Sequence, residues 1–508
     1  MPQYYAVGIL YGGLPATVYG FFLGYLNVPG HVYTAIGVVL TFPWSFKFLI
    51  GMMSDCAPIG GMRRKPYICI GWTLAVIALL VLANTPIPAP YWCEGPDGKY
   101  ITEDPNDAKK PAKGCNLEAA NSGGKFALMM MMVAAGYMIA DVAADGLTVE
   151  FARREPLESR GTIQTTVYLV RAIGQVTAVC FVAFFMNSYE YRGSWGWGLN
   201  FNQVMGCFAI PAAIMVPISW FGIKEDSKSD GEHMTFSAYI DEMYKALKNK
   251  TMLYVILYQF MTPVTAGINT TASNQVQMYW AGVGNFQNQL ANLLGLALFI
   301  IGLKMVNLYF LNDSWRMLML TTTVGLIICD GGLMFITVYD VVRNQYFFLG
   351  EGVLTTIPEA MQFVVSTFVI VEMASDGTEA VTYGLLTTAH NLGGPVGRAL
   401  GNVLFSQFKP EIDKSENFIK DEQHFRNIVA LSFAVSYTFN FLSLLWLLCL
   451  PDQKAETQEW KRTLPSAPRY AVYTLCLLGF GFLFSLTGNM LNMNESTQCM
   501  VLAGGHGC

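Results

Sequence analysis

The sequence predicts an all-α integral membrane protein, with about twelve transmembrane helices in two bundles of six. Hydrophobic residues make up 53% of the 508 residues, whereas charged residues make up only 13%, half the ~25% that is usual for soluble domains. The apolar residues also fall into segments of the ~20 residues that a helix needs to cross a bilayer. We therefore expect most of the chain to face lipid or other apolar helices.

Apolar segments follow one another along the whole chain. They predict helices near 4–25, 31–53, 67–85, 125–149, 161–187, 198–222, 251–280, 285–311, 316–339, 345–373, 380–407 and 425–450, with an additional candidate at 470–489. The first span lacks the basic region of a secretory signal, since the first basic residue is Lys47, so we expect it to remain in the protein. We expect an N-terminal bundle over 1–222, a cytoplasmic central loop over 223–250, a C-terminal bundle over 251–450 and a tail over 451–508.

Basic residues near the helix ends predict the orientation, because they resist translocation. They cluster after the second, fourth, sixth and twelfth spans, and the loops after the first and seventh spans carry none. Both halves are therefore expected to start in the cytoplasm. The basic residues at 99–125 and 409–426 oppose this orientation, although the first group lies in a long loop, where the rule weakens. Cys93 and Cys115 share that loop and form either a disulfide or two free thiols.

Ionisable residues inside spans are the strongest chemical signal, because each costs about 2.5–3.5 kcal/mol at a helix centre. Asp141 and Asp145 share one helical face, where their repulsion would let one of them hold a proton near neutral pH. Lys47 is expected at a similar depth, as their counter-ion. The alternative is an ion-pair cluster that only orients helices. The other intramembrane groups are Arg171, Asp330, Glu359, Glu372, His390 and Arg398.

The seventh predicted span is unusually polar and contains Pro263. A proline there frees a backbone carbonyl and permits a local break, as in the discontinuous helices of transporters. Its polar side chains would face water or a ligand, or would instead form hydrogen bonds between helices. They include Gln259, Thr262, Thr265, Asn269, Thr270, Thr271, Ser273, Asn274 and Gln275.

Two groups of six helices around a basic central loop form the layout of a transporter with two similar halves. The segments VEFA at 149–152 and VEMA at 371–374 occupy equivalent helices of such halves. A passive channel, a membrane receptor and a membrane enzyme remain alternatives, although the longest soluble segment, 86–124, is short for a signalling domain. The sequence has no nucleotide or metal motif and no basic stripe, so we expect no cofactor, no metal and no nucleic acid partner.

The loop after the second span resembles the inner-gate signature of the major facilitator superfamily, with Asp55 before a glycine turn and then Arg63 and Arg64. Longer motifs are more specific. PWSFKFLIGMMSD (43–55), GMRRKPY (61–67), DVAADGL (141–147) and SDGTEAVTYGLLTT (375–388) together resemble the folate-biopterin transporter family. The resemblance covers nearly all of 1–450. The printed sequence starts without the hydrophilic leader of many relatives and has an extra apolar span after residue 470; either a truncated gene model or a variant topology would explain both departures.

The resemblance implies a two-bundle carrier of folates or pterins, or of another metabolite such as S-adenosylmethionine. We expect a monomeric, proton-coupled transporter in the plasma membrane or an organelle membrane. Arginine forks suit carboxylates, and Tyr11, Tyr19 or Tyr168 would stack on a pterin. The candidates for substrate binding are Lys47, Asp141, Asp145, Arg171 and Arg398. Those for ion coupling are Asp141, Asp145, Glu372 and His390, and those for the gate are Asp55, Arg63, Arg64, Asp376 and Glu379.

Overall fold

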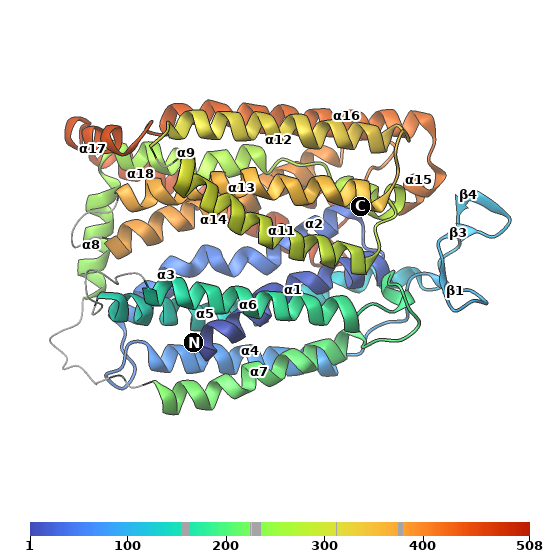
Figure 1. Ribbon diagram of the computed structural model, residues 1–508, viewed down its shortest axis with the longest axis horizontal. Coiled ribbons are helices and arrows are strands. Elements are labelled where there is room, and N and C mark those ends of the chain that lie inside the picture. Colours follow the sequence, from blue (N-terminus) through green and yellow to red (C-terminus); the bar gives the residue numbers. More distant parts are fainter. Residues whose placement is uncertain (154–161, 224, 226–234, 311, 374–378) are drawn as a thin grey trace.

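Figure 1 shows the computed structural model, in which nearly all the long helices run along one axis. The structure describes residues 1–153, 162–223, 225, 235–310, 312–373 and 379–508. In this part of the chain, eleven helices are long and apolar enough to cross a bilayer. The predicted all-α integral membrane architecture is therefore confirmed.

The described residues of the N-terminal half, before residue 223, form seven α-helices. They are α1 (Pro2–Val18), which continues as a π-helical segment over Tyr19–Tyr25, α2 (Gly30–Thr41), α3 (Lys47–Cys56), α4 (Lys65–Asn84), α5 (Gly123–Arg153), α6 (Thr162–Phe185) and α7 (Phe201–Gly222). A 3-10 turn over Phe42–Phe46 joins α2 to α3 in one predicted span. Asn200 and Gln203 form a reciprocal capping box that starts α7.

The C-terminal half begins after α8 (Phe236–Leu247), which lies across the end of the molecule that carries the basic loops (Figure 1). Its helices are α9 (Lys250–Ala266), α10 (Ser273–Gln275), α11 (Asn285–Met305), α12 (Trp315–Val338), α13 (Gln345–Met373), α14 (Glu379–Phe405), α15 (Ser415–Lys420), α16 (Gln423–Leu442), α17 (Lys454–Thr463) and α18 (Pro468–Asn492). Short segments extend three of them: Val276–Trp280 after α10, Val306–Phe310 after α11 and Ser443–Cys449 after α16.

The seventh predicted span is broken in the structure. Helix α9 ends at Ala266, three residues after Pro263, and α10 starts only at Ser273. Proline disturbs the turn that precedes it, but α9 continues past Pro263, and the chain over residues 267–272 is irregular before it becomes helical again. The additional candidate span at 470–489 is also helical, as α18, and packs against α2, α9 and α14.

Close backbone contacts hold equivalent helix pairs together in the two halves. Helix α1 packs on α6, where a Cβ on Gly8 would lie 2.1 Å from the carbonyl oxygen of Arg171. Helix α9 packs on α14, where a Cβ on Gly397 would lie 2.3 Å from the carbonyl oxygen of Val264. Only glycine permits these approaches, as expected for small residues at membrane helix interfaces.

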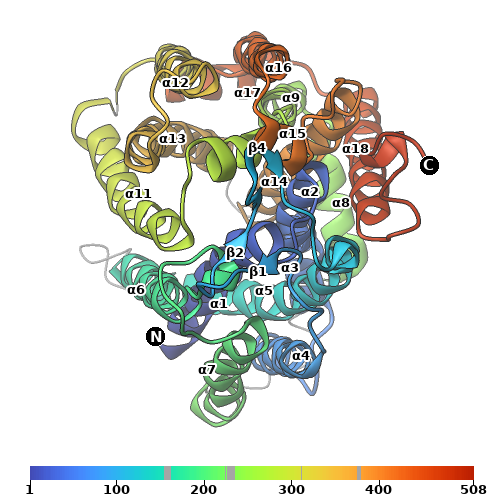
Figure 2. The same ribbon diagram turned by 90° about the vertical axis from the view of Figure 1, so that its right-hand side faces the viewer.

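Seen along the helix axes, the helices form two groups with α2 and α14 between them (Figure 2). The largest hydrophobic core takes nearly all its residues from α1–α7, with Met493 added from the end of the chain. Two further cores are built from residues of the C-terminal half. A small hydrophobic cluster of Tyr19, Leu23 and Met278 joins the two halves.

The end opposite to α8 and α17 carries two small hairpins (Figure 1). Strands β1 (Cys93–Glu94) and β2 (Tyr100–Ile101) are antiparallel, with Cys93 opposite Ile101. Strands β3 (Glu103–Asp104) and β4 (Asp107–Pro111) form the second hairpin, with Glu103 opposite Pro111. A disulfide joins Cys93 to Cys115, and a second, not expected from the sequence, joins Cys499 to Cys508. Both disulfides lie at the end that the basic loops assign to the exterior.

Candidate functional site

The two intramembrane carboxylates of α5 each have their own cation. Lys47, the first residue of α3, places its Nζ 2.8 Å from Oδ2 of Asp145, and the Tyr4 hydroxyl donates to Oδ1 of the same carboxylate at 3.0 Å. One turn earlier, Asp141 accepts from Nη1 of Arg171 on α6 at 3.4 Å. The structure thus brings together four of the five residues that the sequence proposed for substrate binding.

Asp141 and Asp145 differ in how many of their carboxylate oxygens have a hydrogen-bond partner. Both oxygens of Asp145 are engaged, by Lys47 and by Tyr4. Asp141 is fully buried, and its Oδ1 has no hydrogen-bond partner among the described residues. A buried carboxylate oxygen without a donor is costly when the group is ionised. Of the two, Asp141 is therefore the carboxylate better placed to take up a proton.

Aromatic rings surround the Arg171 guanidinium. Its Cζ lies 4.5 Å from the ring centre of Tyr11 and 5.7 Å from that of Trp44. Tyr11 and Trp44 meet edge to face at 5.9 Å, and Trp44 also lies under the Lys47 ammonium. Cation–π contacts of this kind stabilise a cation in a poorly hydrated position. They fix the direction in which Arg171 presents its fork.

A cavity of about 850 Å³ opens beside Arg171, between the two halves. It is lined by α1 and α6 on one side and by the broken helix, α11, α12 and α13 on the other. Its volume is within the roughly 300–1,000 Å³ typical of ligand sites. Its polar and aromatic lining includes Tyr11, Tyr168, Arg171, Gln175, Ser273, Gln277, Asn288, Asn292, Phe299, Asp330, Phe348 and Glu359.

Charges on the cavity wall are separated between the two halves. Arg171 is the basic residue among the described lining residues, whereas Asp330 and Glu359 contribute carboxylates from the C-terminal half. The Tyr437 hydroxyl donates to Asp330 at 2.7 Å. Glu359 follows Pro358 in α13, and its side chain is exposed. The sequence marked both acids as intramembrane groups but did not assign them to the site. Only the packing of α12 on α13 brings both of them to the wall of one cavity.

The broken helix contributes to the cavity only in part. Ser273 and Gln277 line it, beyond the break. Gln259 donates to the carbonyl oxygen of Ser366 at 2.9 Å, and Thr270 shares a 2.8 Å hydrogen bond with Ser432. Both interpretations of this polar span therefore apply, to different residues: some face the cavity and others tie the helix to its neighbours.

Three other candidates lie away from this cavity. Arg398 is not among the described residues that line it; its Nη1 would lie 3.7 Å from a Cβ on Gly37 of α2. Glu372 accepts from Nε2 of Gln458 on α17 at 2.5 Å, next to the last residue of α13. His390 is half-buried on α14, and its Nδ1 has no hydrogen-bond partner in the described part of the chain.

Two of the inner-gate candidates, Asp55 and Arg64, meet where α3 ends and α4 begins. Nη2 of Arg64 lies 2.6 Å from Oδ1 of Asp55, and Nη1 donates to Ser54 at 2.9 Å. Glu225, after α7, accepts the backbone N–H groups of residues 63–65 at 2.8–3.1 Å. Sequence reasoning missed Glu225, although a carboxylate suits the free N–H groups at a helix start. Asp376 and the side chain of Glu379 lie outside the described residues.

Comparisons with known proteins agree with this architecture. The chain matches the model of the BT1 family over residues 8–88 and 115–466. It is 22% identical over 411 residues to a folate-biopterin transporter of Synechocystis sp., covering 79% of this chain and 73% of the relative. It is 28% identical over 140 residues to a probable folate-biopterin transporter 4 of Arabidopsis thaliana, covering 27% of this chain and 22% of the relative.

Solved structures of transporters share the fold. A mutant of the nucleoside transporter NupG superposes with a TM-score of 0.58 at 13% identity, covering 88% of this chain and 98% of that one. The inward-open xylose transporter XylE from E. coli superposes with a TM-score of 0.56 at 12% identity, covering 90% and 98%. At such low identity the likeness shows the fold alone.

Proposed function

Because this chain belongs to the BT1 family of membrane transporters, we propose that it carries a folate or another pterin across its membrane by alternating access, coupled to protons. The observation that carries this proposal is the separation of charge in the cavity, with Arg171 on one wall and Asp330 and Glu359 on the other. A molecule with hydrogen-bond donors at one end and a carboxylate at the other would bridge the two halves.

A folate has these features. The amino group and ring N–H of its pterin are adjacent donors, which a carboxylate such as Glu359 would accept as a pair. Its glutamate carboxylates would meet the Arg171 fork. The flat ring system would stack on Tyr11 or Tyr168, which line the cavity on the Arg171 side. The polar amides of Asn288 and Asn292, on α11, also line the cavity.

Proton coupling follows from competition for Arg171. While Asp141 is ionised, it holds Arg171 through the 3.4 Å contact. A proton on Asp141 would neutralise that partner, and the guanidinium would then be available to the substrate anion. Proton and anionic substrate would therefore favour each other's binding, which is the thermodynamic requirement for symport. Asp145 does not compete for Arg171 in this structure, because it is paired with Lys47 at 2.8 Å.

A second candidate substrate is a cationic metabolite such as S-adenosylmethionine. Asp330 and Glu359 favour it, because their carboxylates face the cavity with no basic partner among the described lining residues. Such a substrate would not need Arg171. The two candidates therefore differ in which wall of the cavity determines affinity.

Uptake into proteoliposomes tests both candidates. Purified protein is reconstituted with an acidic exterior, and accumulation of labelled folate, biopterin and S-adenosylmethionine is followed. We expect saturable uptake of folate and biopterin that ceases when a protonophore collapses the pH gradient. Uptake of S-adenosylmethionine without folate uptake would replace the first candidate by the second. Non-saturable flux of all three substrates would indicate a channel.

A further inference from the structure

The end of the chain, residues 493–508, lies over the outer ends of both halves. Asn492 donates to the carbonyl oxygen of Ala503, and the Cys499–Cys508 disulfide closes this segment into a loop. On the N-terminal half, Gln498 donates to Oδ1 of Asn121 at 3.2 Å. On the C-terminal half, His506 places its Nδ1 3.0 Å from the carbonyl oxygen of Ser406, the residue that follows α14. This tail therefore contacts the two parts that must separate if the outer side is to open.

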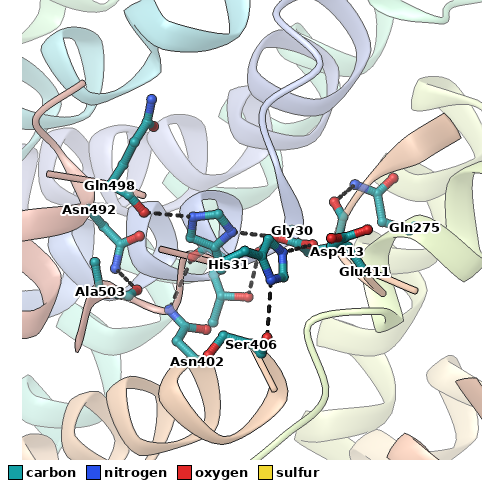
Figure 3. A network of polar contacts seen from close by, with 12 residues as sticks. Gly30, His31, Gln275, Asn402, Ser406, Glu411, Asp413, Asn492, Gln498 and Ala503 are labelled. Carbon is teal, nitrogen blue, oxygen red and sulfur yellow. Dashed lines mark hydrogen bonds and ion pairs between the residues drawn. The ribbon is translucent and has the colours of Figure 1, made fainter. Parts of the chain in front are cut away.

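Asp413, in the loop between α14 and α15, is the centre of these contacts (Figure 3). The residue is 2% exposed. Its Oδ2 lies 2.5 Å from Nδ1 of His31, at the start of α2, and its Oδ1 lies 2.9 Å from Nε2 of His506. Its carbonyl oxygen accepts the N–H of Gly30 at 2.9 Å and Nε2 of Gln275 at 3.1 Å. The carboxylate of Asp413 thus connects α2 to the tail, and its main-chain carbonyl connects α2 to the broken helix.

Each of the two histidines faces two hydrogen-bond acceptors. His31 meets the Asp413 carboxylate through Nδ1 and the carbonyl oxygen of Gln498 through Nε2, at 2.5 and 3.3 Å. His506 meets the carbonyl oxygen of Ser406 and the same carboxylate, at 3.0 and 2.9 Å. A neutral imidazole has one N–H, whereas an imidazolium has two. All four contacts are hydrogen bonds only when both rings are protonated.

We propose that His31, Asp413 and His506 form a proton-binding latch, which takes up protons as the outer side closes and releases them as it opens. The proposal rests on the alternating access of the proposed function, and not on its substrate or on Asp141. In this structure the outer ends are joined: besides the Gly30 contact with Asp413, Asn402 of α14 donates to the carbonyl oxygen of His31 at 3.1 Å. An acidic exterior would therefore stabilise the state in which bound substrate faces the cytoplasm.

The charges around the latch agree with this direction. The hydrogen bond that His506 donates to the Asp413 carboxylate raises the pKa of His506, against the opposing effects of burial and Lys409. Burial alone would raise the pKa of Asp413, but the hydrogen bonds from His31 and His506 lower it below its usual range. Lys409 is itself paired with Glu411 at 2.8 Å. The remaining charged side chains of the loop between α14 and α15 and of the tail are Lys414, beside Glu411, and Glu495, which accepts from Asn121.

The pH window follows from the raised pKa of His506. The stabilisation of the closed state is complete below the usual histidine pKa of about 6.5. It is lost as the pH rises through the higher pKa that His506 has in the closed latch. In the open state the contact with Asp413 is broken, so the proton affinity returns toward its ordinary value. Closing the outer side is therefore linked to proton uptake.

Distances between spin labels on the outer side test the latch directly. Trp197→Cys and Val341→Cys place labels on exposed outer loops of the two halves, in a full-length background without the seven free cysteines. Double electron–electron resonance is recorded between pH 5 and pH 8. We expect the short-distance, outer-closed population to dominate at acid pH. The closed-to-open ratio should fall toward pH 8 by about tenfold for each unit by which the pKa of His506 is higher in the closed state than in the open state.

Variants separate the latch from other outer histidines. His31→Gln and His506→Gln keep a side-chain donor but cannot titrate, and we expect each to flatten the pH dependence. Asp413→Asn should favour the open state at every pH. His424→Gln is the matched control, because His424 is exposed on α16 outside this cluster, and it should behave as the wild type.

Two outcomes would overturn the latch. One is a wild-type distance distribution that changes with substrate but not with pH. The other is a wild-type pH dependence retained in both His31→Gln and His506→Gln. If the distance changes under none of the conditions, with or without substrate, alternating access itself fails, and the latch fails with it.

Discussion

Nη1 of Arg171 on α6 lies 3.4 Å from Oδ2 of Asp141 on α5, and the second oxygen of Asp141 has no described partner. Arg171 is also the basic residue that the described wall of the cavity presents to a substrate. The same cation is therefore shared between an internal carboxylate and the space where a substrate would lie. This contact is the feature through which proton and substrate can affect each other's binding.

Asp141→Asn is expected to abolish proton-driven accumulation. The amide keeps the shape of the carboxylate but cannot exchange a proton, so Arg171 would be available to the substrate at every pH. We expect accumulation under a pH gradient to fall by about tenfold or more, while exchange of labelled for unlabelled substrate continues. Proteoliposome uptake measures both quantities. Glu118→Gln, an exposed change on the outer side, serves as the control, and normal accumulation in Asp141→Asn would exclude this residue as the coupling site.

Arg171→Lys is expected to distinguish substrates by their charge. Lysine retains the positive charge but loses the bidentate fork that binds a carboxylate. Uptake of folate should fall by about tenfold, the loss expected for one charge-assisted hydrogen bond, whereas uptake of a pterin without glutamate should fall less. Initial uptake rates of the two substrates measure the difference. The same measurement on Arg398→Lys tests the arginine that lies beside Gly37, and equal losses of both substrates in Arg171→Lys would indicate a role in packing.

Glu359→Gln and Asp330→Asn are expected to weaken binding of the pterin end. Each variant replaces a carboxylate on the cavity wall by an amide that can accept only through one oxygen. Because Asp330 is already engaged by the Tyr437 hydroxyl, we expect the larger effect, about tenfold in substrate affinity, from Glu359→Gln. Competition by unlabelled biopterin measures this affinity. Unchanged affinity in both variants would remove the C-terminal wall from the site.

Asp55→Asn is expected to favour the inward-open state. The change removes the charge of Asp55, whose Oδ1 lies 2.6 Å from Nη2 of Arg64. Charge-assisted contacts of this kind bias a two-state equilibrium. Gly51→Cys provides the reporter, because a Cβ there has its nearest neighbour, in Val142, at 3.9 Å. A membrane-impermeant maleimide applied from the cytoplasmic side should label it several times faster in Asp55→Asn. An unchanged labelling rate would leave Asp55 and Arg64 as signals of topology.

The sequence by itself determined the membrane class and the positions of most helices, and it predicts the orientation of the chain. These properties depend on local composition: runs of ~20 apolar residues, basic residues beside them and a proline within one polar span. It also marked Lys47, Asp141, Asp145 and Arg171 as costly intramembrane groups, because the free energy of burying a charge does not depend on knowing its partner. The break after Pro263 and the extra helix over Pro468–Asn492 follow the same local rules.

Which groups meet was decided only by the tertiary structure. Asp141 and Asp145 lie one turn apart, yet one pairs with Arg171 and the other with Lys47, because the answer depends on how α3 and α6 pack on α5. Glu359 and Asp330 became cavity residues, and Arg398 did not line the described wall, through the relative rotation of α12, α13 and α14. The contact of His31 with Asp413 spans 382 residues of sequence. No local pattern encodes such a separation, since it arises from two halves whose contact surfaces are set by packing over the whole chain.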